Sequence, residues 1–388
     1  MVQQCHLLKQ PPLPPLRGTV SHKGRGLAIL TSLLLFMLCL PAHADIVLGV
    51  AGPLTGQYAS LGQQMLNGAQ AAVDDLNAKG GLAGQDLRLM SLDDACDIRK
   101  AEEVAQKFID AHVAAVIGHY CSNAALAAAK LYDRAGIVMI APSAGLASLT
   151  TSGLSNVVRL APRDDAQGGL AARRILEKRA TARIALLSDG TEATKGLAAS
   201  FAAGLPQGPA LSLTFKPDAA DFSDVIAKMK SANIDVIYFA CGASDAGHIA
   251  AQAVKVGLQA LRYGPDALVS ELYGQAAGAA AEGTLASFPM DPLLPVQSRQ
   301  ETRALKLAGQ SADGATLPAY AAVQLFAAGV SATNSTNGAT IAQWLKSGVS
   351  VDTVEGSFSF DKNGDATNQR YSWYFWSNGV AQALPEGN

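Results

Sequence analysis

The sequence lacks the short motifs of several large enzyme classes. It contains no Gly-x-Ser-x-Gly nucleophile elbow, no Gly-x-x-x-x-Gly-Lys phosphate loop and no His-Glu-x-x-His zinc motif. After residue 44 the histidines are His112, His119 and His248, and nothing in their spacing brings them together. We therefore expect a protein that is not an enzyme and has neither a bound metal nor a cofactor.

The sequence also lacks a strong charge of either sign. Its 30 Lys and Arg residues nearly balance 32 Asp and Glu, which gives a formal net charge of −2 without a basic stripe. Nucleic acid is therefore not an expected partner. The 388 residues leave 344 after the first 44, too many for one ordinary core, so we expect two domains.

Long apolar runs are absent except near the N-terminus. A basic stretch from Lys9 to Arg25 precedes the apolar run Leu27–Leu40, and an A-x-A cleavage pattern ends at Ala44. We predict a signal peptide over residues 1–44, cleaved near Ala44, and an exported product. A membrane anchor is the alternative, but the run is shorter than the roughly 20 residues that a spanning helix needs. Cys39 lacks the preceding small residue of a lipid-attachment site, which favours a soluble product.

Cysteine is scarce. Cys5 and Cys39 fall in the predicted signal, and Cys96, Cys121 and Cys241 remain. The odd count leaves one of them free or externally paired. We predict a Cys96–Cys121 disulfide across 25 residues, in an oxidising compartment. Cys241 ends an apolar run and is expected to be a small buried hydrophobe.

Short β-rich runs alternate with helical patterns after residue 44. This order predicts an α/β fold with parallel sheets and right-handed crossovers. The expected strands are 46–51, 87–92, 113–118, 137–141, 183–188, 211–215 and 234–240, and the expected helices are 64–78, 99–111, 122–135, 167–178, 196–203, 222–231 and 245–256.

The pattern restarts after residue 163, which predicts two Rossmann-like lobes. We expect the chain to cross between them at 162–164 and to return at 288–292 on a proline-rich hinge strand. The predicted lobes comprise 45–163 with 290–371, and 164–289 with 372–388.

The C-terminal part predicts helices 316–330 and 340–347 and strands 357–360 and 371–376. The loop 361–365 between the two strands resembles a calcium loop but has Ala366 and Ser372 where glycine and glutamate are needed. We instead expect its Asn-Gly pair to turn a β-hairpin.

Two serines follow expected strands of the first lobe. Ser122 follows 113–118, and Ser143 follows 137–141. In open α/β sheets small ligands bind beyond the carboxyl ends of strands, where helix N-termini attract anions. The pattern therefore indicates an anion site, but both serines could also be simple helix N-caps.

Six motifs stand in order along the chain. They are GVAGPLTG at 49–56, NAKGG at 77–81, DDAC at 93–96, GHYCS at 118–122, APSA at 141–144 and GPD at 264–266. Together they resemble the periplasmic leucine/isoleucine/valine-binding proteins of ABC transporters, over nearly all of the chain from Asp45 to about Trp376. The resemblance implies a type I periplasmic binding protein, with two lobes joined by three hinge strands. It also implies the Cys96–Cys121 disulfide.

The resemblance also implies site residues. Ser122 would hydrogen-bond the carboxylate of the ligand, and Ser143 and Ala144 would offer backbone groups to its carboxylate and ammonium. Asp266, where the family often has glutamate, would pair with the ammonium from the other lobe.

This sequence departs from the family pattern around the site. Gly145 stands where the family commonly has threonine or serine, so only backbone is available there. Three positions that often carry aromatic residues in the family hold other residues here: Leu61, Ala193 and Gly242. Tyr58 and Tyr120 lie near site positions in the sequence and would compensate for the missing aromatic side chains. The pocket should be larger than is usual in the family.

We therefore expect a monomeric binding protein of an ABC importer, which delivers an amino acid, branched-chain or otherwise mostly apolar, to a permease in the inner membrane. The alternatives are a protein of this fold that binds an aromatic or other small carboxylate or an amide, a ligand sensor, and a secreted enzyme.

Overall fold

The computed structural model describes residues 45–289, 314–369 and 371–384. The predicted signal peptide, most of the return segment at 288–292 and the side chain of Ala193 lie outside the described residues. No helix in the described ranges combines the length and the apolar character that crossing a bilayer requires.

The first sheet has five parallel strands in the order β2-β1-β3-β4-β5. Successive side chains point to opposite faces, so Val116 and Ile117 on β3 enter two different cores. Both faces are covered by helices, which confirms the predicted α/β class. The strands are β1 (Ile46–Gly52), β2 (Leu87–Asp93), β3 (Ala115–Gly118), β4 (Val138–Ala141) and β5 (Val157–Arg159).

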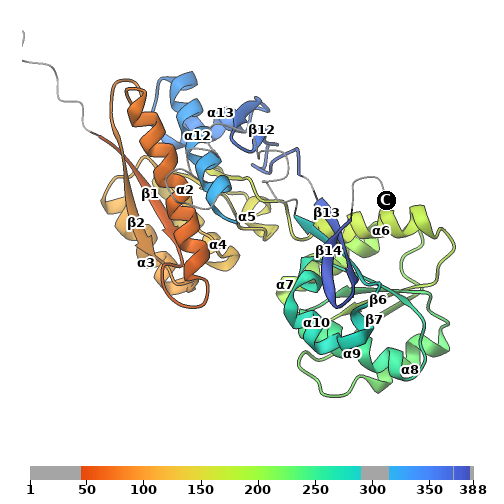
Figure 1. The fold of residues 1–388 in the computed structure, drawn as a ribbon. Helices are drawn as coiled ribbons and strands as arrows, with labels where there is room; N and C mark the ends of the chain where they lie inside the picture. The colour runs from red at the N-terminus through yellow and green to blue at the C-terminus, as the bar shows by residue number, and fades with distance from the viewer. Residues whose placement is uncertain (1–44, 290–313, 370, 385–388) are drawn as a thin grey trace, which may run out of the picture. The chain divides into compact units, whose positions relative to one another are not determined.

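Helices from both ends of the chain cover the first sheet. Figure 1 shows α12, drawn in blue, beside the orange α2, and the two helices pack together on one face with α13. A methyl group on Gly68 would overlap the carbonyl oxygen of Thr316, so glycine allows this close approach. The opposite face packs against α3 and α4. The helices are α2 (Ala59–Ala78), α3 (Ile98–Asp110), α4 (Ser122–Ala135), α5 (Ser148–Thr151), α12 (Thr316–Thr333) and α13 (Gly338–Leu345).

The second sheet has seven strands in the order β14-β13-β10-β9-β8-β6-β7. The strands from β10 to β7 are parallel, and β13 and β14 add to the edge in antiparallel fashion. They are β6 (Ile184–Ser188), β7 (Leu211–Thr214), β8 (Val236–Ala240), β9 (Leu261–Gly264), β10 (Leu285–Pro289), β13 (Tyr371–Ser377) and β14 (Val380–Ala383).

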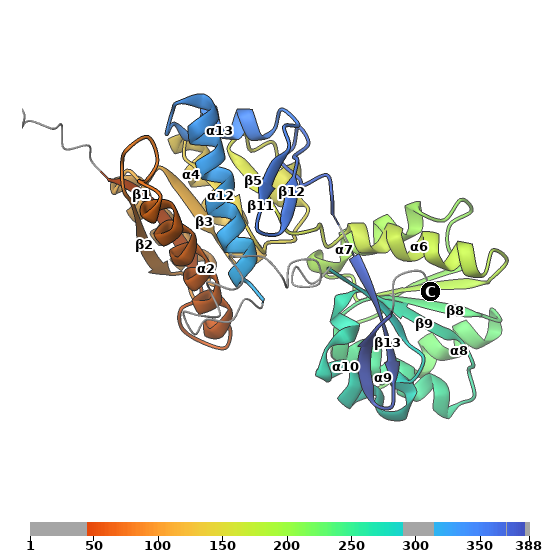
Figure 2. The same cartoon turned by 45° about the horizontal axis from the view of Figure 1, so that its top comes forward.

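Helices lie on both faces of the second sheet as well. Figure 2 shows α6 and α7 above the strands and α9 and α10 below them. Tyr238 on β8 stacks on Phe201 of α7, whereas the next residue, Phe239, enters the core under α8, α9 and α10. The helices are α6 (Ala166–Lys178), α7 (Glu192–Ala203), α8 (Ser223–Ser231), α9 (Ala243–Lys255), α10 (Glu271–Ala277) and the 3₁₀ segments η1 (Asp266–Val269) and η2 (Gly278–Ala281).

The chain passes between the two sheets three times. It leaves the first sheet after β5, returns between β10 and α12, and leaves again before β13. The two sheets agree with a type I binding-protein architecture of two lobes. The exact lobe boundaries at 163, 290 and 371 stay a prediction.

The tight turn predicted at residues 361–365 is found, but the predicted pairing of strand 357–360 with strand 371–376 is wrong. Strand 371–376 corresponds to β13, which pairs with β10 and β14, while β12 (Gly356–Phe358) pairs with β11 (Val351–Thr353) in a small sheet of its own. The loop does turn tightly, since Gly364 N donates to Asp361 O at 3.0 Å. After the turn, Ala366 forms an antiparallel bridge with Phe360, and Thr367 N donates to Ser359 O at 2.8 Å. The side chain of Asp365, the last residue of the loop, bonds to Arg159.

Candidate functional site

The predicted disulfide is present and lies beside a buried polar array. Cys96 and Cys121 are joined, with their Cα atoms 5.4 Å apart, and Cys241 is free and buried. Asp94 accepts hydrogen bonds from Cys96 N at 2.8 Å and from His119 Nδ1 at 2.6 Å. His119 Nε2 lies 3.0 Å from the Tyr132 hydroxyl, whose pKa is raised by burial. These contacts fix the end of β3 against the loop after β2.

Replacing both Cys96 and Cys121 by alanine is expected to lower the free energy of unfolding by about 3 kcal/mol, because the crosslink restricts the unfolded chain. Chemical denaturation followed by circular dichroism measures the loss. Reductant should destabilise the unchanged protein by a similar amount and leave the double variant unaffected. Equal stability of the two proteins under oxidising conditions would contradict this expectation.

Ser122 joins the ends of β3 and β4. It is the first residue of α4, and its Oγ accepts hydrogen bonds from Gly145 N at 3.1 Å and Leu146 N at 3.3 Å. The alternative that Ser122 is an N-cap is wrong, because Cys121 holds that position. A hydroxyl has one donor and two acceptor sites, so the Ser122 O–H can still donate to a ligand oxygen.

Ser143, Ala144 and Gly145 follow β4 after Pro142. Ser143 is not an N-cap either, because the next helix, α5, begins after Ala147. Ala144 and Gly145 are buried, while Ser143 is half-buried, and within the described ranges no hydrogen-bond partner is found for its hydroxyl. The loop therefore offers one serine hydroxyl and closely approachable backbone.

Asp164 lies against this loop from the segment that follows β5. Its N–H donates to Gly145 O at 3.0 Å, and its carboxylate occupies the space next to the Gly145 Cα. Loss of hydration there raises the pKa of Asp164 to about 6, helped by the negative charge of Asp266 and opposed by Arg159. The residue as a whole stays exposed.

Asp266 is held in place by Gln167. Its Oδ1 accepts from Gln167 Nε2 at 2.9 Å, and its backbone N–H donates to Gln167 Oε1 at 3.1 Å. The Ser287 hydroxyl donates to the same Oε1 at 2.7 Å. Gln167 is only 1% exposed although it is polar. These bonds orient the half-buried Asp266 and leave its Oδ2 without a partner among the described residues.

Gln167 and Asp164 were both missed as site residues. The sequence did contain a sign of Gln167's role. Gln167 lies on the same face of α6 as the buried residues Gly168, Ala171 and Ile175. A glutamine on the apolar face of a helix needs buried polar partners. For Asp164 the sequence offered only its place at the predicted lobe crossing.

Two tyrosines, Tyr58 and Tyr120, were expected to replace the missing aromatic side chains of the pocket. Both belong to the part of the chain that forms the first sheet. Tyr58 is the N-cap of α2 and 42% exposed, and Leu61 is half-buried one turn later. Burial raises the pKa of the half-buried Tyr120, and the nearby Tyr58 raises it further. The two tyrosines are thus neighbours, and their place in a pocket stays a prediction.

Gly242 lies beyond the end of β8, exposed at the start of α9. Its N–H donates to Asp189 Oδ2 at 3.2 Å, and a Cβ built on it would meet no heavy atom within 4 Å. The space beside Gly242 is therefore open, and the larger pocket stays a prediction. Ala193 lies in α7, but its side chain is outside the described residues.

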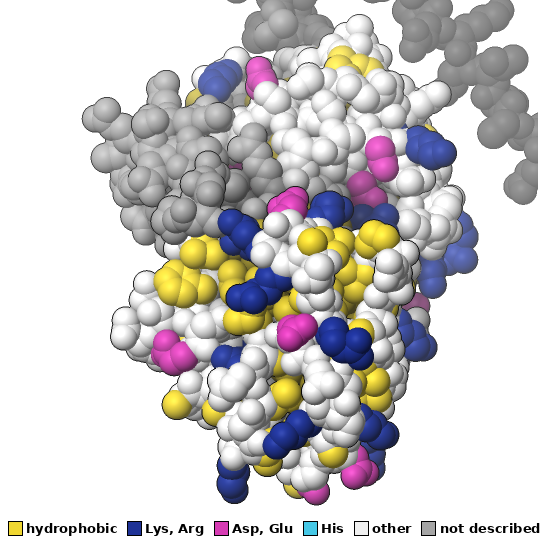
Figure 3. Space-filling view, turned by 90° about the vertical axis from the view of Figure 1, so that its right-hand side faces the viewer, with side chains coloured by type: hydrophobic (Ala, Val, Ile, Leu, Met, Phe, Trp, Pro, Cys, Tyr) yellow, Lys and Arg dark blue, Asp and Glu magenta, His cyan; other side chains and the backbone are white. Residues whose placement is uncertain are grey.

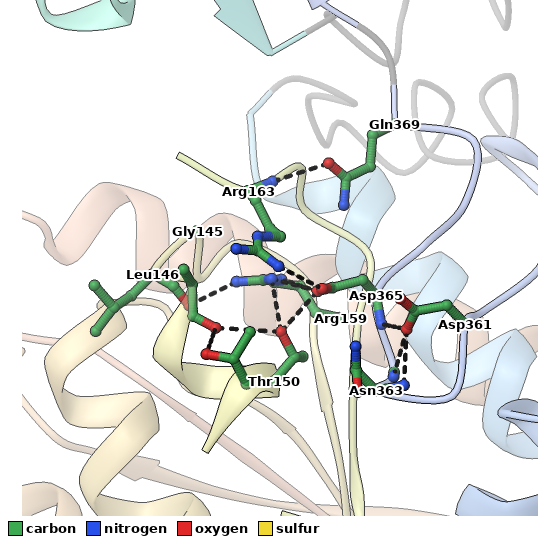
Figure 4. Close-up of polar contacts among 12 residues, drawn as sticks. Gly145, Leu146, Thr150, Arg159, Arg163, Asp361, Asn363, Asp365 and Gln369 are labelled. Atoms are coloured by element: carbon green, nitrogen blue, oxygen red, sulfur yellow. Dashed lines mark hydrogen bonds and ion pairs between the residues drawn. The ribbon is translucent and has the colours of Figure 1, made fainter. Parts of the chain in front are cut away.

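A buried ion-pair network lies behind the Gly145 loop (Figure 4). Arg159, at the end of β5, has a fully buried side chain and pairs with Asp365, whose side chain is 8% exposed. Its Nη1 donates to Leu146 O at 2.7 Å, and its Nη2, which also contacts Asp365, donates to Thr150 Oγ1 at 2.9 Å. Arg163 lies 3.4 Å from Asp365 and also pairs with Asp165.

The predicted polar site residues are linked by a continuous series of contacts. Ser122 bonds to Gly145, Gly145 to Asp164, and Asp164 O accepts from Gln167 N at 3.3 Å. Gln167 in turn holds Asp266. Figure 3 shows one face of the surface, where Lys and Arg side chains lie among hydrophobic and acidic ones. The linked residues follow the carboxyl ends of the parallel strands β3, β4, β5 and β9.

Two doubly wound sheets with such strand ends define a class of solute-binding protein. The family model described as "Periplasmic binding protein" matches residues 45–379. The chain is 36% identical over 342 residues to the Leu/Ile/Val-binding protein of Escherichia coli K12, covering 87% of this chain and 92% of that protein. The chain belongs to the periplasmic binding protein family, which implies an extracytoplasmic location.

Two further similarities extend the comparison. An "Amino acid binding protein" of Pseudomonas aeruginosa PAO1 is 34% identical over 351 residues, which cover 89% of this chain and 94% of that protein. Among solved structures, an ABC transporter substrate-binding protein from Desulfitobacterium hafniense in complex with Leu is 26% identical with a TM-score of 0.70, covering 88% of this chain and all of that one.

Proposed function

We propose that this chain is the solute-binding component of an ABC importer and that it captures an α-amino acid between its two lobes. The Ser122 hydroxyl and the backbone of residues 143–145 would bind the carboxylate, and Asp266 would accept from the ammonium. The observation that carries the proposal is the contact series from Ser122 through Gly145 and Gln167 to Asp266. The similarity to the Leu/Ile/Val-binding protein of Escherichia coli supports the same ligand class.

Capture of this kind needs no covalent chemistry. Charge-assisted hydrogen bonds to the carboxylate and the ammonium are about twice as strong as neutral ones, and closure would remove water from both. Closure would be favoured only by the difference in ligand affinity between the open and closed states. The protein would act as an exported monomer, with residues 1–44 cleaved near Ala44 as a signal peptide, and would deliver the ligand to an inner-membrane permease.

Isothermal titration calorimetry of the purified protein tests the proposal. The panel consists of the twenty standard amino acids, with benzoate as a carboxylate that lacks an amine. We expect heat from one or more apolar amino acids and none from benzoate. Binding of benzoate alone would favour a ligand without an amine, and no heat from any amino acid would overturn the proposal.

A further inference from the structure

The carboxylate of Asp164 fills the place of the side chain that Gly145 lacks. A methyl group on Gly145 would overlap both carboxylate oxygens and the Cγ of Asp164. The Asp164 N–H is bonded to Gly145 O at 3.0 Å, so the two residues are held together on the backbone as well. An acidic group therefore lies at the strand-end loop where the proposed ligand would bind.

Asp164 is not neutralised by the cations near it. The charged or titratable groups that face it are Asp266, Asp165, Arg159 and Tyr371. Arg159 forms an ion pair with Asp365, and Arg163 forms ion pairs with Asp165 and Asp365. Among the described residues, Asp164 makes no ion pair of its own. Asp164 and Asp266 are thus two carboxylates that repel each other. Gln167 binds the carboxylate of Asp266 through its side chain and the backbone carbonyl of Asp164 through its N–H.

We propose that Asp164 is a second acceptor for the cationic group of the ligand, beside Asp266, and that it selects ligands bearing a primary amine. The inference rests on the proposed function and adds a specificity-determining residue to that site. An ammonium group has three N–H donors, enough for both carboxylates at once. A carboxylic acid without an amine would leave the two negative charges facing each other and would be rejected.

The proposal makes capture depend on pH. With a pKa of about 6, Asp164 in the free protein takes up a proton as the pH falls through that value. A bound ammonium favours the ionised carboxylate, so binding at low pH must first release this proton. The affinity should therefore be highest above pH 6 and fall below it.

Calorimetry with L-leucine, or with the tightest-binding amino acid of the panel, tests the proposal at about pH 7.5 and about pH 5. The unchanged protein should bind about tenfold more weakly at the lower pH, as expected for one obligatory ionisation. Asp164→Asn should bind about tenfold more weakly than the unchanged protein at the higher pH, and its affinity should hardly change with pH. A pH dependence that persists in Asp164→Asn would overturn the proposal.

Gly145→Ala provides an independent test. The new methyl group should displace the Asp164 carboxylate and weaken binding about as much as Asp164→Asn, and the two changes together should cost little more than either alone. Additive losses, or full affinity in Asp164→Asn, would overturn the proposal while leaving amino-acid capture intact. If no amino acid binds the unchanged protein, the proposed function fails together with the inference.

Discussion

Replacing Asp365 by asparagine is expected to lower the free energy of unfolding by about 3–5 kcal/mol, the usual cost of breaking a buried ion pair. The Arg159 side chain is fully buried, and Asp365 is the carboxylate that neutralises it. Asparagine keeps the shape and loses the charge, so the guanidinium would stay buried without a counter-ion. Urea unfolding followed by circular dichroism measures the change.

The matched control is Asp110→Asn, which makes the same chemical change on the exposed surface of α3. Asp110 accepts only from Gln106, so its replacement should change stability by no more than about 0.5 kcal/mol. Replacing Arg159 by methionine as well as Asp365 by leucine removes both charges, and this double variant should lose less than the two single losses combined. A loss in Asp365→Asn as small as that in Asp110→Asn would show that the pair contributes little.

Replacing Asp266 by asparagine is expected to weaken amino-acid binding by about 2–5 kcal/mol, or roughly 30-fold to several-thousand-fold in Kd. The amide oxygen of asparagine can still accept from Gln167 Nε2, so the position of residue 266 should be kept while its charge is lost. The expected loss therefore reports on the ammonium of the ligand. Calorimetry with the tightest-binding amino acid of the panel measures it.

The control for this prediction is Asp224→Asn in the first turn of α8, an exposed aspartate away from the strand-end residues. It should leave both the affinity and the stability within about 0.5 kcal/mol of the unchanged protein. Unchanged affinity in Asp266→Asn, with the fold intact by circular dichroism, would exclude Asp266 as the ammonium partner and would favour a ligand without an amine.

The longer helices and strands could be predicted because the hydrophobic periodicity of their sequences matches the burial of their residues. The helix predicted at 122–135 is α4 with the same bounds, and β1, β2 and β4 are found within one residue. The elements that were missed are short, such as the three-residue β5 and the four-residue β9. Runs of this length contain too few residues to show a period. The pairing of β13 was mistaken because partner strands far apart in sequence leave no local signal.

The candidate site was predicted in part, and the remainder depends on tertiary packing. Ser122 and Ser143 follow their strands as expected, since strand ends can be read from the order of the elements. The contact between Asp164 and Gly145 could not be predicted, because it depends on where the chain turns after β5. The same holds for Arg159 and Asp365, which are 206 residues apart and form one pair.

A crystal structure of the protein with its tightest-binding amino acid tests the central claim most directly. The account predicts that the carboxylate of the ligand lies within about 3 Å of the Ser122 hydroxyl and that its ammonium lies as close to an Asp266 oxygen. An amino acid bound elsewhere, or with its ammonium turned away from Asp266, would contradict the account.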